Sequence, residues 1–276
     1  MNARPFDNLV FVSFGNSPEW DFARFRLNRV LKKNFPYANR FIVNQNWLFK
    51  TSLYRENEGF FHKNRRGYGL WTWKPLLIME AFALYPKCEF AVYLDMGCDL
   101  NINAQSLKRF NEYLDIAKQE NVLAFDLPWR AVDWSAQNVI EYFDASQSTQ
   151  NVVIAGVLFL KNSTKIHSLL EEWFSLMTYD NFSLAVGSTE TSLQLSSNHR
   201  HDQSILSFLW HRNRLNCIPD ETFWISHGKF DSDNPIWTSR NREFFSVDIS
   251  SALRQLSRVI RKFVVYLRLK LRIKLQ

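Results

Sequence analysis

The chain has 276 residues, of which 46% are hydrophobic and 16% aromatic, enough to bury the core of one large domain. This composition excludes a disordered chain, a collagen-like chain and a coiled coil. The three cysteines are unevenly spaced and the first residues lack the apolar stretch of a secretory signal, which favours a cytoplasmic protein without a disulfide framework.

The net charge of +7 belongs to the C-terminal end of the chain. Residues 252–276 hold eight basic residues and no acid, whereas residues 1–251 hold 26 bases and 27 acids. Apolar residues in this segment recur at spacings of three and four, which predicts a basic amphipathic helix. We therefore expect a domain over residues 1–245 and a tail over residues 246–276 that binds an anionic membrane surface, on the inner face of the plasma (inner) membrane.

Other interpretations of the tail stay open. The helix can pack on its own domain, or bind nucleic acid through phosphate charge, and the alternation over residues 268–275 is also compatible with an edge strand. No nucleic-acid partner is expected, because the basic residues of such proteins are more often spread across the fold.

In chain order, apolar β-branched runs predict strands, and apolar residues at helical spacing predict helices. The predicted strands cover residues 8–14, 40–43, 90–94, 122–125, 151–160 and 223–225. The predicted helices start near residue 17 and cover residues 75–84, 105–119, 163–177 and 202–209, whereas residues 44–70 and 179–198 are predicted to be irregular. This alternation predicts an α/β fold, a single Rossmann-like domain with a mostly parallel central sheet flanked by helices.

Two acids follow a fully apolar predicted strand. Asp95 comes directly after residues 90–94 and Asp99 four residues later, at the carboxyl end of the strand, where open α/β sheets bind ligands. Two carboxylates there can hold a divalent cation that neutralises a diphosphate. The alternative is structural, with Asp95 capping a loop and Asp99 solvated.

Residues 92–99 (VYLDMGCD) resemble the YxDxD region of nucleotide-sugar-dependent glycosyltransferases with the GT-A fold. The resemblance is greatest to bacterial enzymes of capsule, O-antigen or lipopolysaccharide synthesis, whose pattern reads G-x-W-x-W-K-P … YLDxGCE. It includes residues 69–75 (GLWTWKP), 151–160, 201–204 (HDQS) and 227–229 (HGK), and it spans roughly residues 8–242.

The resemblance implies a role for each matched residue. Asp95 corresponds to the first acid of the DxD element, while its second acid is replaced by Gly97, so that Asp99 is the candidate substitute. The implied cofactor is a divalent cation, Mn²⁺ or Mg²⁺, and the implied metal ligands are Asp95, Asp99 and His227. The implied donor-binding residues are Lys74, Trp73, Tyr93, Asp95, Gly97, Gly156, Lys229 and Arg240. Asp202 and Gln203 are expected to face the donor sugar as the catalytic pair.

Several of these residues also have a structural interpretation. Trp73 can belong to the core, Gly156 can mark a β-bulge, and Asp202 can be a helix N-cap. Lys74 lies at a predicted helix start, where a cation can face a phosphate, whereas an arginine such as Arg240 is most often a solvated surface charge.

The predicted function is transfer of a sugar from a nucleotide-sugar donor, a UDP-sugar by preference, to a hydroxyl of a glycan or lipid-linked glycan, with retention weakly favoured. One alternative is a carbohydrate- or nucleic-acid-binding protein without catalysis. Another is a zinc protein that uses His199, His201, His211 and Cys217. A glycoside hydrolase is a minor alternative, because Asp95 and Asp99 are too close in sequence to flank a glycosidic bond.

Overall fold

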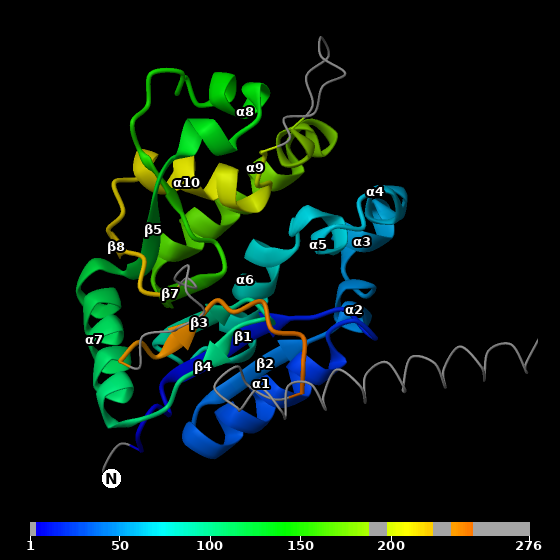
Figure 1. Ribbon diagram of the computed structural model, residues 1–276. Coiled ribbons are helices and arrows are strands. Elements are labelled where there is room, and N and C mark those ends of the chain that lie inside the picture. Colours follow the sequence, from blue (N-terminus) through cyan, green and yellow to red (C-terminus); the bar gives the residue numbers. More distant parts are fainter. Residues whose placement is uncertain (1–3, 188–197, 223–232, 245–276) are drawn as a thin grey trace, which may run out of the picture.

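A central sheet organises the computed structural model, which describes residues 4–187, 198–222 and 233–244 (Figure 1). Its described strands pair in the order β2-β1-β3-β7-β5-β6, with β8 also on β5. Their bounds are β1 (Leu9–Phe14), β2 (Asn39–Val43), β3 (Phe90–Leu94), β5 (Val122–Arg130), β6 (Asn151–Val153), β7 (Val157–Lys161) and β8 (Cys217–Pro219). Five of these seven strands point one way, while β6 and β7 run antiparallel to their neighbours. The predicted α/β fold with a mostly parallel sheet is therefore confirmed.

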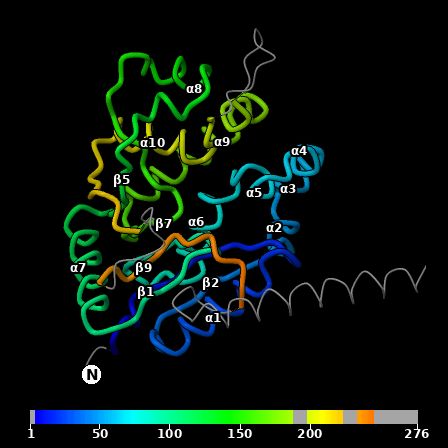
Figure 2. Tube along the Cα trace, viewed as in Figure 1, coloured from blue at the N-terminus to red at the C-terminus, as the bar shows by residue number. Residues whose placement is uncertain are grey.

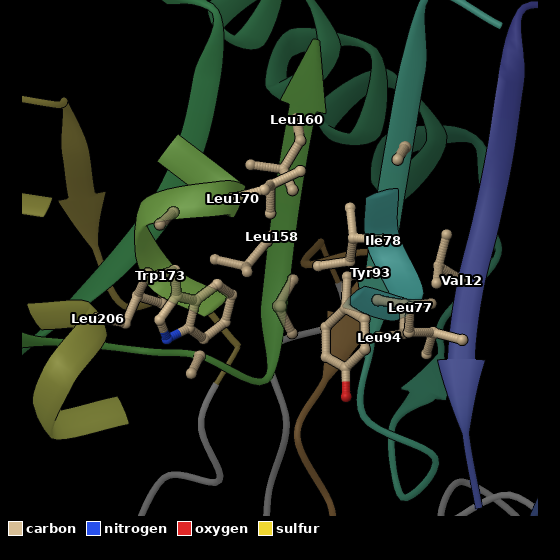
Figure 3. Close-up of a cluster of buried hydrophobic side chains, with 14 of the residues drawn as sticks. Val12, Leu77, Ile78, Tyr93, Leu94, Leu158, Leu160, Leu170, Trp173 and Leu206 are labelled. Atoms are coloured by element: carbon tan, nitrogen blue, oxygen red, sulfur yellow. The ribbon is translucent and has the colours of Figure 1, made fainter. Parts of the chain in front are cut away.

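The strands are apolar on both sides because helices cover both faces of the sheet. The longer helices are α1 (Asp21–Asn34), α6 (Lys74–Leu84), α7 (Ala104–Glu120), α9 (Thr164–Val186) and α10 (Asp202–Arg212). Within β1, Phe11 packs against Phe110 of α7, whereas Val12 lies beside Leu77 of α6 in the buried cluster of Figure 3. Successive side chains of a strand point to opposite faces, so α6, α9 and α10 share one face and α7 lies on the other.

Short helices fill the region that was predicted to be irregular. They are α2 (Gln45–Leu48), α3 (Ser52–Glu56), α4 (Glu58–Lys63) and α5 (Gly67–Leu70), and they lead into α6. Further along the chain, a 3₁₀ turn η1 (Ala131–Trp134) and α8 (Gln137–Tyr142) follow β5. Among the described residues, no helix has the length and apolar content that crossing a membrane needs.

A second, two-stranded sheet lies at the end of β3. It joins β4 (Asp99–Leu100) to β9 (Ile236–Trp237) in antiparallel register. Figure 2 shows the segment that contains β9, in orange, passing from there towards α1. The C-terminal part of the described chain thus closes over the loop that follows β3.

The structure also corrects three other predicted elements. The strand predicted over residues 151–160 is interrupted. Val153 of β6 pairs with Asp126 of β5, and Phe159 of β7 pairs with Leu123 of β5. Between these two pairs, the segment from β6 to β7 contains six residue steps and β5 contains three. Three residues of this stretch are thus extra and bulge from the ladder, although the N–H of Ile154 still donates to the carbonyl oxygen of Phe125. Helix α9 extends to Val186, eight residues into the segment predicted as a loop, with non-helical dihedral angles from Tyr179 to Phe182.

The third correction concerns the start of α10. Its N-cap position is held by His201, and Asp202 is the first residue of the helix. The strand predicted at residues 223–225 and the tail predicted over residues 246–276 lie outside the described residues.

Candidate active site

Three charged side chains from three elements meet at the carboxyl end of β3. Lys74 begins α6, Asp95 directly follows β3 and Asp202 begins α10. The Lys74 Nζ lies 2.5 Å from an oxygen of Asp202 and 3.5 Å from an oxygen of Asp95. Lys74 and Asp202 are buried, whereas 45% of the Asp95 side chain is exposed. The cluster therefore reaches solvent through Asp95.

The bulge at residues 154–156 completes this cluster. The Lys74 Nζ donates a third bond, of 3.0 Å, to the carbonyl oxygen of Ala155. The backbone N–H of Asp95 donates to the carbonyl oxygen of Gly156 at 2.8 Å. A Cβ atom at position 156 would lie 2.8 Å from the Asp95 carboxylate, so glycine leaves the space that this carboxylate occupies. Gly156 is thus a bulge residue that also leaves room for the Asp95 carboxylate.

Tyr93 contacts the Asp95 carboxylate from the side of the hydrophobic core. Its ring is buried in the core, and its hydroxyl points out of the hydrophobic cluster (Figure 3). That hydroxyl donates to Asp95 Oδ1 at 2.8 Å, and the Lys74 Nζ lies 4.9 Å from the ring centroid. Burial, reinforced by the charge of Asp95, raises the pKa of Tyr93 well above its ordinary value. Tyr93 therefore stays a donor at physiological pH.

Burial and ion pairing oppose one another within the cluster. Burial raises the pKa of Asp202 to about 6, although the charge and hydrogen bond of Lys74 act in the other direction. Burial also disfavours the charge on Lys74, but the negative charges of Asp202 and Asp95 outweigh it and raise the pKa of Lys74. At pH 7 the lysine is therefore protonated, while Asp202 is near its titration range.

The loop after β3 is covered by the backbone of the C-terminal segment. A Cβ atom at Gly97 would lie 2.8 Å from the Cα of Arg240, so glycine permits this close approach. The carbonyl oxygen of Gly97 accepts from the N–H of Asn241 and from the hydroxyl of Ser239, both at 2.9 Å. Gly97 thus has a packing role, and it places the exposed Arg240 beside the Asp95 loop.

Asp99 belongs to a separate buried ion pair. Its carboxylate lies 3.0 Å from the Nε of Arg26 and accepts from Ser239 Oγ and Asn241 Nδ2 at 2.7 and 3.0 Å. Arg26 also donates to the carbonyl oxygens of Asn241 and Glu243. A buried carboxylate bonded in this way ties the C-terminal segment to α1. The prediction that Asp99 is solvated or binds a metal is not supported by these contacts.

The described residues do not make up the predicted metal site. Mn²⁺ and Mg²⁺ prefer several oxygen ligands, and Asp95 is the one exposed carboxylate of the predicted set in the part of the chain that the structure describes. No group of three or more His, Cys, Asp or Glu side chains gathers there in a geometry suited to a metal. His227 and Lys229 lie outside the described residues.

Two further residues of the predicted site differ in their surroundings. Trp73 is buried, packs on Phe14 with ring centroids 4.2 Å apart, and donates to the carbonyl oxygens of Gly67 and Tyr68. It is a core residue and has no free surface for a donor. Gln203 follows Asp202 in α10 and is partly exposed.

The zinc alternative is not supported by the described residues. His199 is buried, accepts from the N–H of Ala136 and faces the carbonyl oxygens of Leu184 and Ala185, so both ring nitrogens have backbone partners. Burial, together with the charge of His201, lowers the pKa of His199 to about 4. His201 and His211 bond to backbone carbonyls as well. The ring nitrogens of these three histidines thus contact the backbone of neighbouring segments.

Sequence patterns missed the residues that organise this site. Nothing in the sequence marks the carbonyl oxygen of Ala155 as a partner of Lys74. Arg26 carries a recognisable signal, because it lies three residues after Ala23 on the buried stripe of α1, where a charge requires a partner. The ion pair between Lys74 and Asp202 joins residues 128 positions apart and has no local signature.

Comparisons with known proteins find similar solved structures. No family model and no curated protein sequence matches the chain. A solved glycosyltransferase involved in the glycosylation of the major capsid of PBCV-1 is similar at 12% identity and a TM-score of 0.48, covering 83% of this chain and 92% of that one. Mouse xyloside xylosyltransferase 1 in its apo form is similar at 12% identity, with a TM-score of 0.42 and coverage of 83% and 96%.

A third similar structure is the galactosyltransferase LgtC in complex with donor and acceptor sugar analogues, at 12% identity, with a TM-score of 0.38 and coverage of 83% and 86%. All three are glycosyltransferases, the class that the sequence motifs also resemble. At these identities and TM-scores the likeness says nothing about substrates, so the proposals below are based on the residues of the site.

Proposed function

We propose that the chain is a glycosyltransferase that moves a sugar from a nucleotide-sugar donor, a UDP-sugar in the first instance, to a hydroxyl of a glycan or lipid-linked glycan. The observation that carries the proposal is the cluster of Lys74, Asp202 and the half-exposed Asp95 at the carboxyl end of β3. A buried lysine shared between two carboxylates fixes their positions and charges, which suits recognition of a polar, hydroxyl-rich ligand.

Each residue of the cluster has a proposed task. Asp95, held by Tyr93 and by the backbone of Gly156, contacts the donor where the cluster opens to solvent. Asp202 and Gln203 lie at the start of α10 and orient the donor sugar. Lys74 does not meet the phosphates itself, because it is buried and saturated by Ala155, Asp95 and Asp202, and instead keeps Asp202 ionised.

A divalent cation, Mn²⁺ or Mg²⁺, stays a prediction that rests on the resemblance and on residues outside the described part, His227 among them. When bound, such an ion would neutralise negative charge on the leaving diphosphate. Because the described residues supply one exposed carboxylate for it, we route no step through the ion.

Ligand-induced stabilisation tests the proposal directly. UDP and a panel of UDP-sugars should raise the Tm of the wild-type protein, since a ligand at 100 times its Kd stabilises a fold by about 2.7 kcal/mol. The Asp95→Asn variant should lose that shift, and the matched control Asp115→Asn, an exposed acid on α7, should keep it. A full shift in Asp95→Asn, or no shift with any nucleotide sugar in the wild type, would refute the proposal.

We also propose that the basic segment over residues 252–276 associates with an anionic membrane surface, which would bring the enzyme to lipid-linked acceptors at the inner face of the plasma (inner) membrane. The support is its eight basic residues without an acid and its apolar spacing. Co-sedimentation with vesicles that contain phosphatidylglycerol should decrease on deletion of residues 252–276. Equal sedimentation of the deleted form would contradict this part of the proposal.

A further inference from the structure

Three arginines come from segments that border the Asp95–Asp202 cluster: Arg66 directly before α5, Arg200 two residues before Asp202, and Arg240 after β9. We call them the basic rim. Arg66 and Arg240 are exposed, and Arg200 is partly exposed. Residues far apart in the sequence thus bring three positive charges near one another.

Aromatic side chains connect two of these arginines to the cluster. The Arg66 guanidinium lies over the ring of Trp71 at 5.8 Å, and Trp71 stacks on His201, the residue before Asp202, at 6.2 Å. The Arg200 guanidinium lies over Trp134 at 4.4 Å. Each guanidinium is attracted to the face of its aromatic ring, and this contact uses none of its N–H donors.

Contacts of the backbone fix the positions of Arg200 and Arg240. The N–H of Arg200 donates to the carbonyl oxygen of Trp134 at 3.2 Å, and its own carbonyl oxygen accepts from Gln203 at 3.1 Å. The Cα of Arg240 sits over Gly97, two residues after Asp95. The basic rim is therefore built onto the same loops that present Asp95 and Asp202.

These charges act on one another without a counter-charge. Burial first, and then the positive charges of Arg66 and Arg240, lower the pKa of Arg200. Within residues 4–187, 198–222 and 233–244, no carboxylate forms an ion pair with any of these three arginines. Gathering unpaired like charges costs free energy, which a bound anion would offset.

We infer that the basic rim binds an anionic group of the substrate, a phosphate- or carboxylate-type oxyanion, beside Asp95 and Asp202. This inference rests on the proposed function, because it assigns the anion to a substrate of that site. Two sources have this chemistry: the diphosphate of the nucleotide sugar, and an acidic group on the acceptor glycan. Guanidinium groups bind both in bidentate fashion.

Direct binding measurements in EDTA test the inference without relying on activity. The probes are inorganic pyrophosphate, UDP, uridine and an oligosaccharide of uronic acid. The variants are Arg66→Gln and Arg200→Gln, and the control is Arg55→Gln, an exposed arginine on α3. We expect each rim variant to weaken pyrophosphate binding about tenfold or more. Arg55→Gln should change it less than about twofold. Arg66 is exposed, so Arg66→Gln tests the rim even where Arg200→Gln alters folding.

The possible outcomes distinguish the donor diphosphate from an acidic acceptor as the bound anion. They also distinguish failure of the basic-rim inference from failure of the proposed function. Weaker UDP binding with unchanged uridine binding assigns the rim to the donor diphosphate, and weaker binding of the acidic oligosaccharide alone assigns it to the acceptor. Rim variants that bind every anion as the control does would overturn the inference, even if Asp95→Asn still loses the nucleotide-sugar response. Conversely, rim-dependent pyrophosphate binding in a protein that ignores all nucleotide sugars would support an anion site and refute the proposed function.

Discussion

Replacing Lys74 with Met removes the positive charge that keeps Asp202 ionised. Without its partner, buried Asp202 takes up a proton at pH 7, and this proton uptake limits the loss of stability. Keeping a carboxyl with an ordinary pKa of 3.8 protonated at pH 7 costs about 4 kcal/mol. About 3 kcal/mol of that cost is already present in the native protein, where the pKa of Asp202 is about 6. We therefore expect Lys74→Met to lower the free energy of unfolding by about 1–2 kcal/mol at pH 7, below the 3–5 kcal/mol typical of broken buried ion pairs.

The sign of the pH dependence follows from the raised pKa. An acid whose folded pKa lies above its unfolded value loses stability as the pH rises from the unfolded pKa through the folded one. That window ends near pH 6 in the wild type and extends to higher pH in Lys74→Met. The difference in stability between the two proteins should therefore be larger at pH 7 than at pH 4.5, where Asp202 is protonated in both.

Urea unfolding at pH 4.5 and pH 7 measures this difference, with Lys87→Met as the control on an exposed lysine. If Asp202 must be ionised for sugar transfer, the rise of kcat/KM with pH should occur near pH 6 in the wild type and at higher pH in Lys74→Met. An equal loss of stability at both pH values, together with an unmoved activity profile, would refute the role given to Lys74.

Three further predictions concern neighbouring groups. Gly156→Ala places a Cβ atom 2.8 Å from the present position of the Asp95 carboxylate, so kcat/KM should fall at least about tenfold while the Tm changes little; unchanged kinetics would contradict that role. Arg26→Met leaves Asp99 buried without its ion pair and should cost about 3–5 kcal/mol in chemical denaturation, a loss that an Arg26→Met, Asp99→Asn double variant should partly recover. His199 has a pKa lowered to about 4, so its contribution to stability, about 3 kcal/mol, is present above pH 6.5 and is lost as the pH falls to 4; unfolding curves of His199→Asn should lack that part of the slope.

The sequence predicted the framework of the fold because its signals are local. The run at residues 90–94 has the bounds of β3, and α6 begins one residue before its predicted start. The strand at residues 151–160 was predicted as continuous, since a bulge conserves the apolar character of the run and only the pairing register shows it. The role of Gly156 as a bulge residue was one of two interpretations that the sequence left open.

For the candidate site, the sequence predicted which residues lie near one another better than it predicted their contacts. The position of Asp95 at the carboxyl end of a strand, together with the resemblance, predicted that Lys74 and Asp95 lie near one another. The Lys74 Nζ and an Asp95 carboxylate oxygen lie 3.5 Å apart. Sequence alone did not reveal that Lys74 is buried between two carboxylates or that Asp99 pairs with Arg26. Such long-range ion pairs depend on the packing of α1, α6 and α10 against the sheet, which no local pattern encodes.

A crystal structure with an intact nucleotide sugar would test the central claim most directly. We predict the sugar beside Asp95, Asp202 and Gln203, and the basic rim within hydrogen-bonding distance of an anionic group of a substrate. A donor bound elsewhere, for instance in the surface hollow beside α7 that Gln105, Arg109 and Asn234 line, would contradict the account.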